Sequence, residues 1–310
     1  MSCNVLYAGR PDAWPTYEPL LRTALDQAGA DAVLRNDFAP EDTDYIVYAP
    51  NGPVQDFTPF TRLKAVLSLW AGVEKITPNT TLTQPLCRMV DPGLTEGMVE
   101  WVTGHTLRYH LSIDHWITAQ NGDWTPRVPP LARERKVAVL GLGALGLACA
   151  RALAALGFDV TGWSRSPKEA GGITCLNGPA GLTEALSMAE IVILLLPDTP
   201  ATENTLNADT LALLPKGAKI INPGRGPLID DTALLAALNS GQVGHATLDV
   251  FRTEPLPADH AYWAHPNVTV TPHIAAETRP STASEAIAEN IRRGEAGEPF
   301  LHLVDRALGY

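Results

Sequence analysis

Three side chains in the second half of the chain, Arg225, Glu254 and His273, have the chemistry needed to reduce a carbonyl that lies next to a carboxylate. Each follows a short apolar run, in a stretch with the composition of a loop. A guanidinium can bind the carboxylate, and a protonated imidazole can donate a proton to the new hydroxyl. A carboxylate beside the imidazole favours its proton-donating form. We therefore expect these three residues to be catalytic.

A glycine-rich turn precedes all three residues and follows the apolar run 137–140. Gly141 permits a tight turn, Gly143 lets the backbone approach a pyrophosphate, and Gly146 lets the next helix pack on the strand. Because the turn lies in a strand–turn–helix–strand unit, it predicts a dinucleotide site at a helix N-terminus, with a simple packing turn as the alternative. The residues of this turn that we expect to bind the cofactor are Gly141, Leu142, Gly143, Ala144, Leu145 and Gly146.

The segment after the next predicted strand, 158–162, indicates which dinucleotide is bound. A site for NAD places an acid there, on the ribose 2′-hydroxyl. This chain instead has an arginine between two serines, with Lys168 nearby, and these groups suit a 2′-phosphate. We therefore predict NADP as the cofactor, and a solvated basic turn is the alternative. The residues expected at the 2′-phosphate are Trp163, Ser164, Arg165 and Ser166.

Predicted strands alternate with helices along the chain, which is typical of parallel, doubly wound sheets. In the second half the strands are 191–196, 219–221, 245–248 and 268–270, and the helices are 182–188 and 231–239. The first hundred residues have strand patterns at 4–7, 32–34, 45–48 and 65–69 and a helix at 20–28. A long helix, 95–119, leads to the glycine turn, and a last helix, 281–293, follows the second half.

This order of elements predicts an α/β fold with two doubly wound domains. We expect a Rossmann NAD(P)-binding domain, residues 99–278, inserted in a discontinuous flavodoxin-like substrate domain, residues 1–98 and 279–310. A ligand cleft is expected between the two domains.

Composition restricts the partners. The formal net charge of -11 argues against binding to nucleic acid or to an anionic membrane. The four cysteines are scattered, without metal-ligand spacing, so we expect reduced thiols and no metal site. No signal peptide is evident, and the longest apolar run, 191–196, is far too short to span a bilayer. We therefore expect a cytoplasmic protein.

The segments that carry the three expected catalytic residues resemble motifs of the D-isomer-specific 2-hydroxyacid dehydrogenases. They are Asn-Pro-Gly-Arg-Gly at 222–226, Asp-Val-Phe-Arg-Thr-Glu-Pro at 249–255 and Pro-His at 272–273. The resemblance covers about residues 136–276. Within this family, the Trp-Ser-Arg-Ser turn and the ending, 304–310, resemble the glyoxylate/hydroxypyruvate reductase A group. The resemblance implies NADPH-dependent reduction of a short 2-oxo acid, such as glyoxylate or hydroxypyruvate, to the D-2-hydroxy acid.

The resemblance also implies a role for each site residue. Arg225 would hold the substrate carboxylate and polarise the keto oxygen, His273 would donate the proton, and Glu254 would hydrogen-bond the other ring nitrogen of His273. Asp249 would bond the nicotinamide carboxamide, and Pro197 would line the cofactor groove through its backbone. The further residues expected along this groove are Leu196, Pro223, Gly224 and His273.

The chain departs from the family in the glycine-rich loop that binds the substrate carboxylate. Here Trp70 replaces a small residue, while Ala71 and Gly72 remain small. The indole of Trp70 would restrict the pocket to short substrates, or alternatively it would turn into the core between the domains. Trp263 is a second pocket candidate. The residues expected to bind the substrate are Trp70, Ala71, Gly72, Arg225 and Trp263.

Other functions are compatible with parts of this pattern. One alternative is another family member, such as a phosphoglycerate or formate dehydrogenase, although Glu254 speaks against the formate enzyme. A second is a non-catalytic protein that senses dinucleotides, against which the three catalytic residue types argue. By analogy with the family we expect a homodimer, with Trp101, Val102, Leu111 and Trp116 of the helix 95–119 at its interface.

Overall fold

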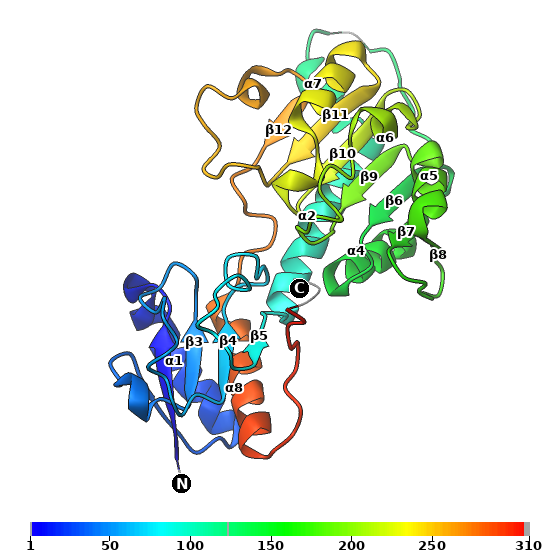
Figure 1. The fold of residues 1–310 in the computed structure, drawn as a ribbon. Coiled ribbons are helices and arrows are strands. Elements are labelled where there is room, and N and C mark those ends of the chain that lie inside the picture. The colour runs from blue at the N-terminus through cyan, green and yellow to red at the C-terminus, as the bar shows by residue number, and fades with distance from the viewer. Residues whose placement is uncertain (1, 123, 307–310) are drawn as a thin grey trace. The chain divides into compact units, whose positions relative to one another are not determined.

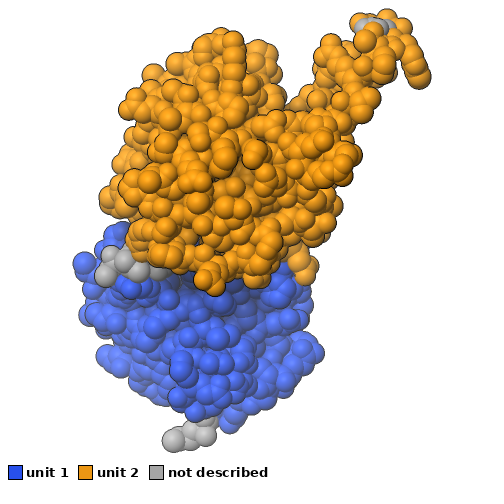
Figure 2. All heavy atoms as spheres, turned by 90° about the vertical axis from the view of Figure 1, so that its right-hand side faces the viewer, with its two compact units in different colours: residues 1–94, 278–310 blue, residues 95–277 orange. Residues whose placement is uncertain are grey.

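The structure is a computed structural model, and it describes residues 2–122 and 124–306. The chain divides into two compact units, Met1–Leu94 with Thr278–Tyr310 as unit 1 and Thr95–Glu277 as unit 2 (Figure 2). The predicted domain boundaries, 98/99 and 278/279, lie within four residues of these divisions.

Unit 1 contains a five-stranded parallel sheet with the strand order β2-β1-β3-β4-β5. This is the order of flavodoxin-like domains. The strands are β1 Cys3–Ala8, β2 Ala32–Arg35, β3 Tyr45–Tyr48, β4 Ala65–Ser68 and β5 Leu86–Cys87. Strands β3 and β4 are buried along their whole length, which explains why their sequences do not alternate between apolar and polar residues.

Two helices cover one face of this sheet, α1 (Trp14–Ala28) and α8 (Pro280–Glu295) (Figure 1). Leu21 of α1 and Ile287 of α8 belong to the same core. The last helix of the chain is therefore part of the unit that the first strands form, and this makes unit 1 discontinuous in sequence.

Unit 2 contains a seven-stranded parallel sheet with the order β12-β11-β10-β9-β6-β7-β8. Counted from β6, this is the Rossmann order 3-2-1-4-5-6 with an additional strand at one edge. The strands are β6 Lys136–Leu140, β7 Asp159–Ser164, β8 Thr174–Asn177, β9 Ile191–Leu194, β10 Ala218–Asn222, β11 Val243–Leu248 and β12 Val268–Val270. The strand order reverses between β6 and β9, where ligands bind in sheets of this kind. The predicted fold class is confirmed.

The remaining elements connect these strands. The helices are α2 Pro92–His110, α3 Ile113–Thr118, α4 Ala144–Ala155, α5 Gly178–Met188, α6 Ala208–Ala212 and α7 Asp231–Ser240. Short 3-10 helices lie at Pro11–Ala13, Pro40–Asp42, Ala132–Glu134, Gly226–Leu228 and Ala261–Ala264. In the part of the chain that the structure describes, no helix combines the length and the apolar character needed to cross a bilayer.

One predicted element is wrong. The expected helix 95–119 is two helices, because Ser112 has a left-handed backbone (φ 53°) that interrupts the α-helical path between α2 and α3. The break has no glycine or proline to indicate it.

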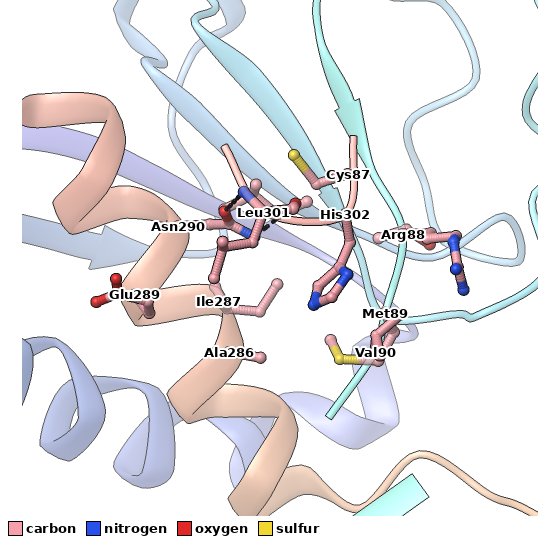
Figure 3. A pocket seen from close by; sticks show the side chains of 12 residues that line it. Cys87, Arg88, Met89, Val90, Ala286, Ile287, Glu289, Asn290, Leu301 and His302 are labelled. Atoms are coloured by element: carbon pink, nitrogen blue, oxygen red, sulfur yellow. Dashed lines mark hydrogen bonds between the residues drawn. The ribbon is translucent and has the colours of Figure 1, made fainter. Parts of the chain in front are cut away.

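Unit 1 also contains a cavity of about 60 Å³ between α8 and the ends of β4 and β5 (Figure 3). The ring of His302 points into it from the chain segment that follows α8. None of the predicted site residues lines this cavity.

Candidate active site

The loops that carry Arg225, Glu254 and His273 follow three neighbouring strands of unit 2, β10, β11 and β12. These strands are parallel, so their carboxyl ends lie at the same edge of the sheet. The sheet order therefore brings together three loops that are up to about fifty residues apart in sequence.

The imidazole of His273 is paired with the carboxylate of Glu254. Nδ1 of His273 lies 2.8 Å from Oε2 of Glu254, and the N–H of Phe251 donates to Oε1 at 2.9 Å. Burial acts to raise the pKa of Glu254, but these two hydrogen bonds and the charges of His273 and Arg225 lower the pKa below its usual value. Glu254 therefore stays an anion that can hold a proton on Nδ1, which leaves Nε2 of His273 available for a substrate.

A buried carboxylate, Asp249, fixes the loop that carries His273. Asp249 is fully buried, and its carboxylate accepts the hydroxyl of Thr271 at 2.5 Å and the N–H groups of Ile274 and Ala275 at 2.9 Å each. The N–H of His273 donates to the carbonyl of Asp249 at 2.8 Å. His273 itself has a left-handed backbone (φ 56°), a conformation that costs a residue with a side chain about 1–2 kcal/mol. The contacts with Asp249 hold the loop in this conformation.

The loop that carries Arg225 is braced by Asn222, which is buried at the end of β10. The side-chain amide of Asn222 donates to the carbonyl of Arg225 at 2.9 Å, and its oxygen accepts the N–H of Gly224 at 3.1 Å. The guanidinium of Arg225 donates to the carbonyl of Gly224 at 2.7 Å. The neighbouring Pro223 completes this tight turn.

The glycine-rich turn has a backbone that fits a pyrophosphate. Gly141 has a positive φ of 108°, and a Cβ on Gly146 would lie 1.8 Å from the carbonyl oxygen of Gly141. A Cβ on Gly143 would meet no atom within 4 Å, so the space before the N-terminus of α4 is open there. Gly141 also packs against the backbone of Leu195 at the end of β9. A helix N-terminus with open space in front of it can bind phosphate through its N–H groups.

The turn after β7 is held to the rest of unit 2 by hydrogen bonds. Nε1 of Trp163 donates to the carbonyl of Gly178 at 2.9 Å, and the hydroxyl of Ser164 donates to the carbonyl of Ser166 at 2.8 Å. Nζ of Lys168 donates to the carbonyl of Leu142 at 2.6 Å, so this cation lies beside the glycine turn. Arg165 and Ser166 have exposed side chains, as residues that bind a 2′-phosphate require.

The remaining predicted cofactor contacts lie at the ends of β9 and β10. Leu196 is buried, and the carbonyl of Pro197 accepts the hydroxyl of Thr202 at 2.6 Å. A Cβ on Gly224 would lie 2.7 Å from the carbonyl oxygen of Leu194, so only a glycine lets the turn after β10 approach β9 this closely. These segments form the wall of unit 2 next to the reversal in strand order.

The predicted substrate residues are divided between the two units. In unit 1, Trp70 is half-buried against the core, its carbonyl accepts the N–H of Met89 at 3.0 Å, and the ammonium of Lys75 lies over its ring. Ala71 and Gly72, which follow it, are partly exposed. In unit 2, Trp263 is exposed, and its Nε1 donates to the carbonyl of Pro257 at 2.9 Å.

Several residues that position the site were not predicted from the sequence. Asn222 lies within a recognised motif and Thr271 directly precedes one, but no role was predicted for either side chain. The hydrogen bonds by which Asp249 holds the His273 loop were also not predicted. Of the ending that resembles one group of the family, residues 307–310 lie outside the described residues.

Comparison with known proteins gives consistent matches. A family model, the NAD binding domain of D-isomer specific 2-hydroxyacid dehydrogenase, matches residues 105–275. The glyoxylate/hydroxypyruvate reductase A of Serratia proteamaculans (strain 568) is 42% identical over 257 residues, which cover 80% of this chain and 82% of that protein. The protein of the same name from Yersinia enterocolitica is 39% identical over 298 residues, which cover 94% of each chain.

Solved structures match over the whole chain. A D-isomer specific 2-hydroxyacid dehydrogenase from Xanthobacter autotrophicus Py2, in complex with NADPH and MES, is similar with a TM-score of 0.93 and 41% identity, covering 100% of both chains. The NADPH-dependent glyoxylate/hydroxypyruvate reductase SmGhrA from Sinorhizobium meliloti, in complex with NADP and sulfate, is similar with a TM-score of 0.85 and 33% identity, also covering 100% of both chains.

Proposed function

This chain belongs to the D-isomer specific 2-hydroxyacid dehydrogenase family, and we propose that Arg225, Glu254 and His273 perform its chemistry. It is an NADP-dependent oxidoreductase that reduces glyoxylate and hydroxypyruvate. The observation that supports the proposed roles most directly is the 2.8 Å contact between Nδ1 of His273 and Oε2 of Glu254. This contact prepares the imidazole to donate a proton from Nε2.

Each of the three side chains has a separate task in the proposed mechanism. The guanidinium of Arg225 binds the substrate carboxylate and polarises the keto oxygen. His273 donates the proton from Nε2 to that oxygen, and Glu254 stabilises the imidazolium through Nδ1. The hydride for the carbonyl carbon would come from NADPH when it is bound. The product of hydroxypyruvate would be the D-2-hydroxy acid.

The cofactor would be held by the loops at the reversal in strand order of unit 2. The residues from Gly141 to Gly146 would bind the pyrophosphate through N–H groups at the start of α4. Arg165 and Ser166 would bind the 2′-phosphate from the turn after β7, and the ammonium of Lys168 lies beside the glycine turn, where it donates to the carbonyl of Leu142. The expected bond from Asp249 to the nicotinamide carboxamide does not fit a carboxylate that is fully buried, so Asp249 is proposed to act on the site by holding the loop 271–275.

The substrate-binding residues are proposed separately within each unit. In unit 1, backbone N–H groups around Ala71 and Gly72 would bind a carboxylate, and Trp70 would limit the size of the substrate. In unit 2, Arg225 would bind the substrate carboxylate, and Trp263, which follows the Glu254 loop, is proposed to contact the substrate. A test of the role of Trp70 is Trp70→Gly, which should increase activity on longer 2-oxo acids, and an unchanged substrate profile would contradict it.

We also propose a homodimer that forms through the segment from α3 to β6. Figure 2 shows an arm that projects from the body of unit 2. Trp124 on this segment is 97% exposed, and further exposed apolar side chains favour a protein partner. They are Leu111, Ile113, Ile117, Val128 and Leu131. Val102, which we expected at such an interface, is instead fully buried in the core of unit 2. Light scattering in solution would measure the oligomeric state.

A cytoplasmic location is proposed on the basis of the cysteines. Cys3, Cys87, Cys149 and Cys175 are all free thiols. Free, mostly buried thiols are typical of proteins in a reducing compartment.

The function is tested by following NADPH oxidation with glyoxylate or hydroxypyruvate as substrate. We expect turnover by the wild type, slower turnover with NADH, and weak activity on pyruvate and 3-phosphohydroxypyruvate. His273→Ala should reduce kcat at least about 100-fold while NADPH binding stays nearly unchanged. If the affinity for NADPH fell as much as kcat, the proposed proton donor would be wrong.

A further inference from the structure

The segment that joins Asp249 to Glu254 contains an arginine that the proposed mechanism does not use. This residue is Arg252, in the middle of the Asp-Val-Phe-Arg-Thr-Glu-Pro segment. Its side chain is 32% exposed, and all of its partners belong to unit 2. The acceptors around its guanidinium are Glu203, Asn204, Pro227, Ile229 and Asp231.

Two of these acceptors are carbonyls in the segment that follows Arg225. Nη2 of Arg252 donates to the carbonyl of Ile229 at 2.8 Å and to that of Pro227 at 3.2 Å. The guanidinium thus connects the loop after β11 to the loop after β10. A lysine in this place has a single ammonium and lacks the planar fork that reaches several acceptors at once.

The other acceptors connect the same guanidinium to two more elements. Nη1 of Arg252 donates to Glu203 at 3.3 Å, and Nη2 donates to the side chain of Asn204 in the same turn. Nε lies 3.8 Å from the carboxylate of Asp231 at the start of α7. Because Arg252 reaches three segments, 203–204, 227–229 and the start of α7, the loop after β11 is fixed to several parts of unit 2.

The backbones of the two catalytic loops also touch at this place. A Cβ on Gly226 would lie 2.0 Å from the carbonyl carbon of Phe251 and 2.3 Å from the nitrogen of Arg252. Gly226 is the residue after Arg225, so the chain that carries the substrate-binding guanidinium packs directly on the chain that carries Arg252. A small shift of one loop therefore displaces the other.

This fixation acts on Glu254 through the residue next to Arg252. The N–H of Phe251 orients the Glu254 carboxylate by donating to Oε1 at 2.9 Å, while Oε2 pairs with His273. We infer that Arg252 is a positioning residue, whose guanidinium fixes the loop after β11 against the segment after Arg225 and thereby orients Glu254 toward His273. The effect of Arg252 on turnover rests on the proposed function, whereas its effect on the pairing of Glu254 with His273 rests on the geometry alone.

The test compares Arg252→Met and Arg252→Lys with the wild type and with a matched control, Arg292→Met. Arg292 is also bonded to two carboxylates, Glu289 and Glu298, but it belongs to α8 of unit 1. Three properties are measured: kcat and KM with glyoxylate and NADPH, the Kd of NADPH, and the ¹⁵N chemical shifts of the His273 ring. These shifts report which ring nitrogen carries the proton, and they need no turnover.

We expect Arg252→Met to reduce kcat/KM about 10–100-fold, because a displacement of about 1 Å in the catalytic groups has an effect of this size. The Kd of NADPH should stay within about threefold, and the His273 shifts should move toward those of Glu254→Gln. Arg252→Lys should have an intermediate effect on kcat/KM and on the His273 shifts, whereas Arg292→Met should change neither of these two properties.

Two results would overturn the inference. One is an Arg252→Met protein with wild-type His273 shifts, whatever its stability. The other is a loss of turnover in Arg252→Met and Arg292→Met to the same extent, which would indicate a general structural role. A wild type that shows the expected His273 shifts but does not reduce any 2-oxo acid would refute the proposed function and leave the positioning measured by NMR intact.

Discussion

His273 and Glu254 follow different strands of the unit 2 sheet, yet Nδ1 of His273 and Oε2 of Glu254 lie 2.8 Å apart. The charges of His273 and Arg225 and the hydrogen bonds to Glu254 offset the effect of its burial and lower its pKa. The pair therefore places the anionic carboxylate of Glu254 next to the imidazole of His273, which can carry a proton. It also fixes the tautomer of the imidazole, because Nδ1 must carry the proton that Glu254 accepts.

The first prediction follows from this pair. Glu254→Gln should reduce kcat about 100–1,000-fold, because an amide stabilises an imidazolium less than a carboxylate does. Glu254→Asp should retain part of the activity, since its charge is kept but its reach is shorter. Steady-state kinetics with NADPH and glyoxylate measures both. A Glu254→Gln protein with wild-type kcat would exclude a catalytic role for the pair.

The second prediction concerns Asp249, whose buried carboxylate accepts three hydrogen bonds from residues 271–275. In Asp249→Asn, the amide nitrogen would face one of these donors, so at least one hydrogen bond would be lost in a buried place. We expect a loss of about 1–3 kcal/mol of stability and a large decrease in kcat. Thermal unfolding and kinetics measure these effects. An unchanged Tm with a weakened affinity for NADPH would instead indicate that Asp249 acts mainly on the carboxamide.

Much of the site was predictable because its chemistry depends on residue types that stand in fixed motifs. The glycine turn, Arg225, Glu254 and His273 are such residues, and the alternation of strands and helices predicted the sheet that orders their loops. The contacts that hold the loops together were not predictable. Arg252 and Pro227 are adjacent only because β10 and β11 are neighbours in the sheet, and no local sequence pattern encodes that pair.

The prediction of secondary structure failed where the local sequence pattern was weak. Strand β5 has two residues, which is too short for a periodic pattern, and it is held by β4 on one side and by a single bridge from Cys87 to Leu303. The interruption between α2 and α3 falls at Ser112, a residue that is common inside helices as well as at their ends. For β5, pairing with strands and segments far away in the sequence decides the local conformation.

The third prediction concerns the choice between NADPH and NADH. Arg165→Ala should raise the KM for NADPH about 10–100-fold, because one charge-assisted hydrogen bond to a 2′-phosphate contributes about 1.5–3 kcal/mol. The KM for NADH should hardly change. Arg151→Ala, which removes an exposed charge near the end of α4, is the matched control. Equal losses with both cofactors would contradict a contact with the 2′-phosphate.

The fourth prediction concerns the dependence of stability on pH. Burial and the nearby charge of Arg108 lower the pKa of His245 to about 4, and its Nε2 lies 3.0 Å from the hydroxyl of Thr269. Arg108 donates to the same hydroxyl at 2.9 Å, so Thr269 donates its proton to a neutral His245 ring. The ring therefore stays neutral in the folded protein at a pH where the unfolded chain is protonated.

The direction in which stability changes with pH follows from proton linkage. Between about pH 6.5 and 4 the unfolded state binds a proton at His245 that the folded state does not, so stability decreases as the pH falls through this window. The contribution is on the order of 1–3 kcal/mol. His245→Asn keeps an acceptor for Thr269 but does not titrate in this window. Its Tm should therefore fall less than that of the wild type when the pH is lowered from about 7, above the window, to about 5, inside it. Parallel Tm curves for the two proteins would mean that the ring is already charged in the folded state or that its protonation has no effect on folding.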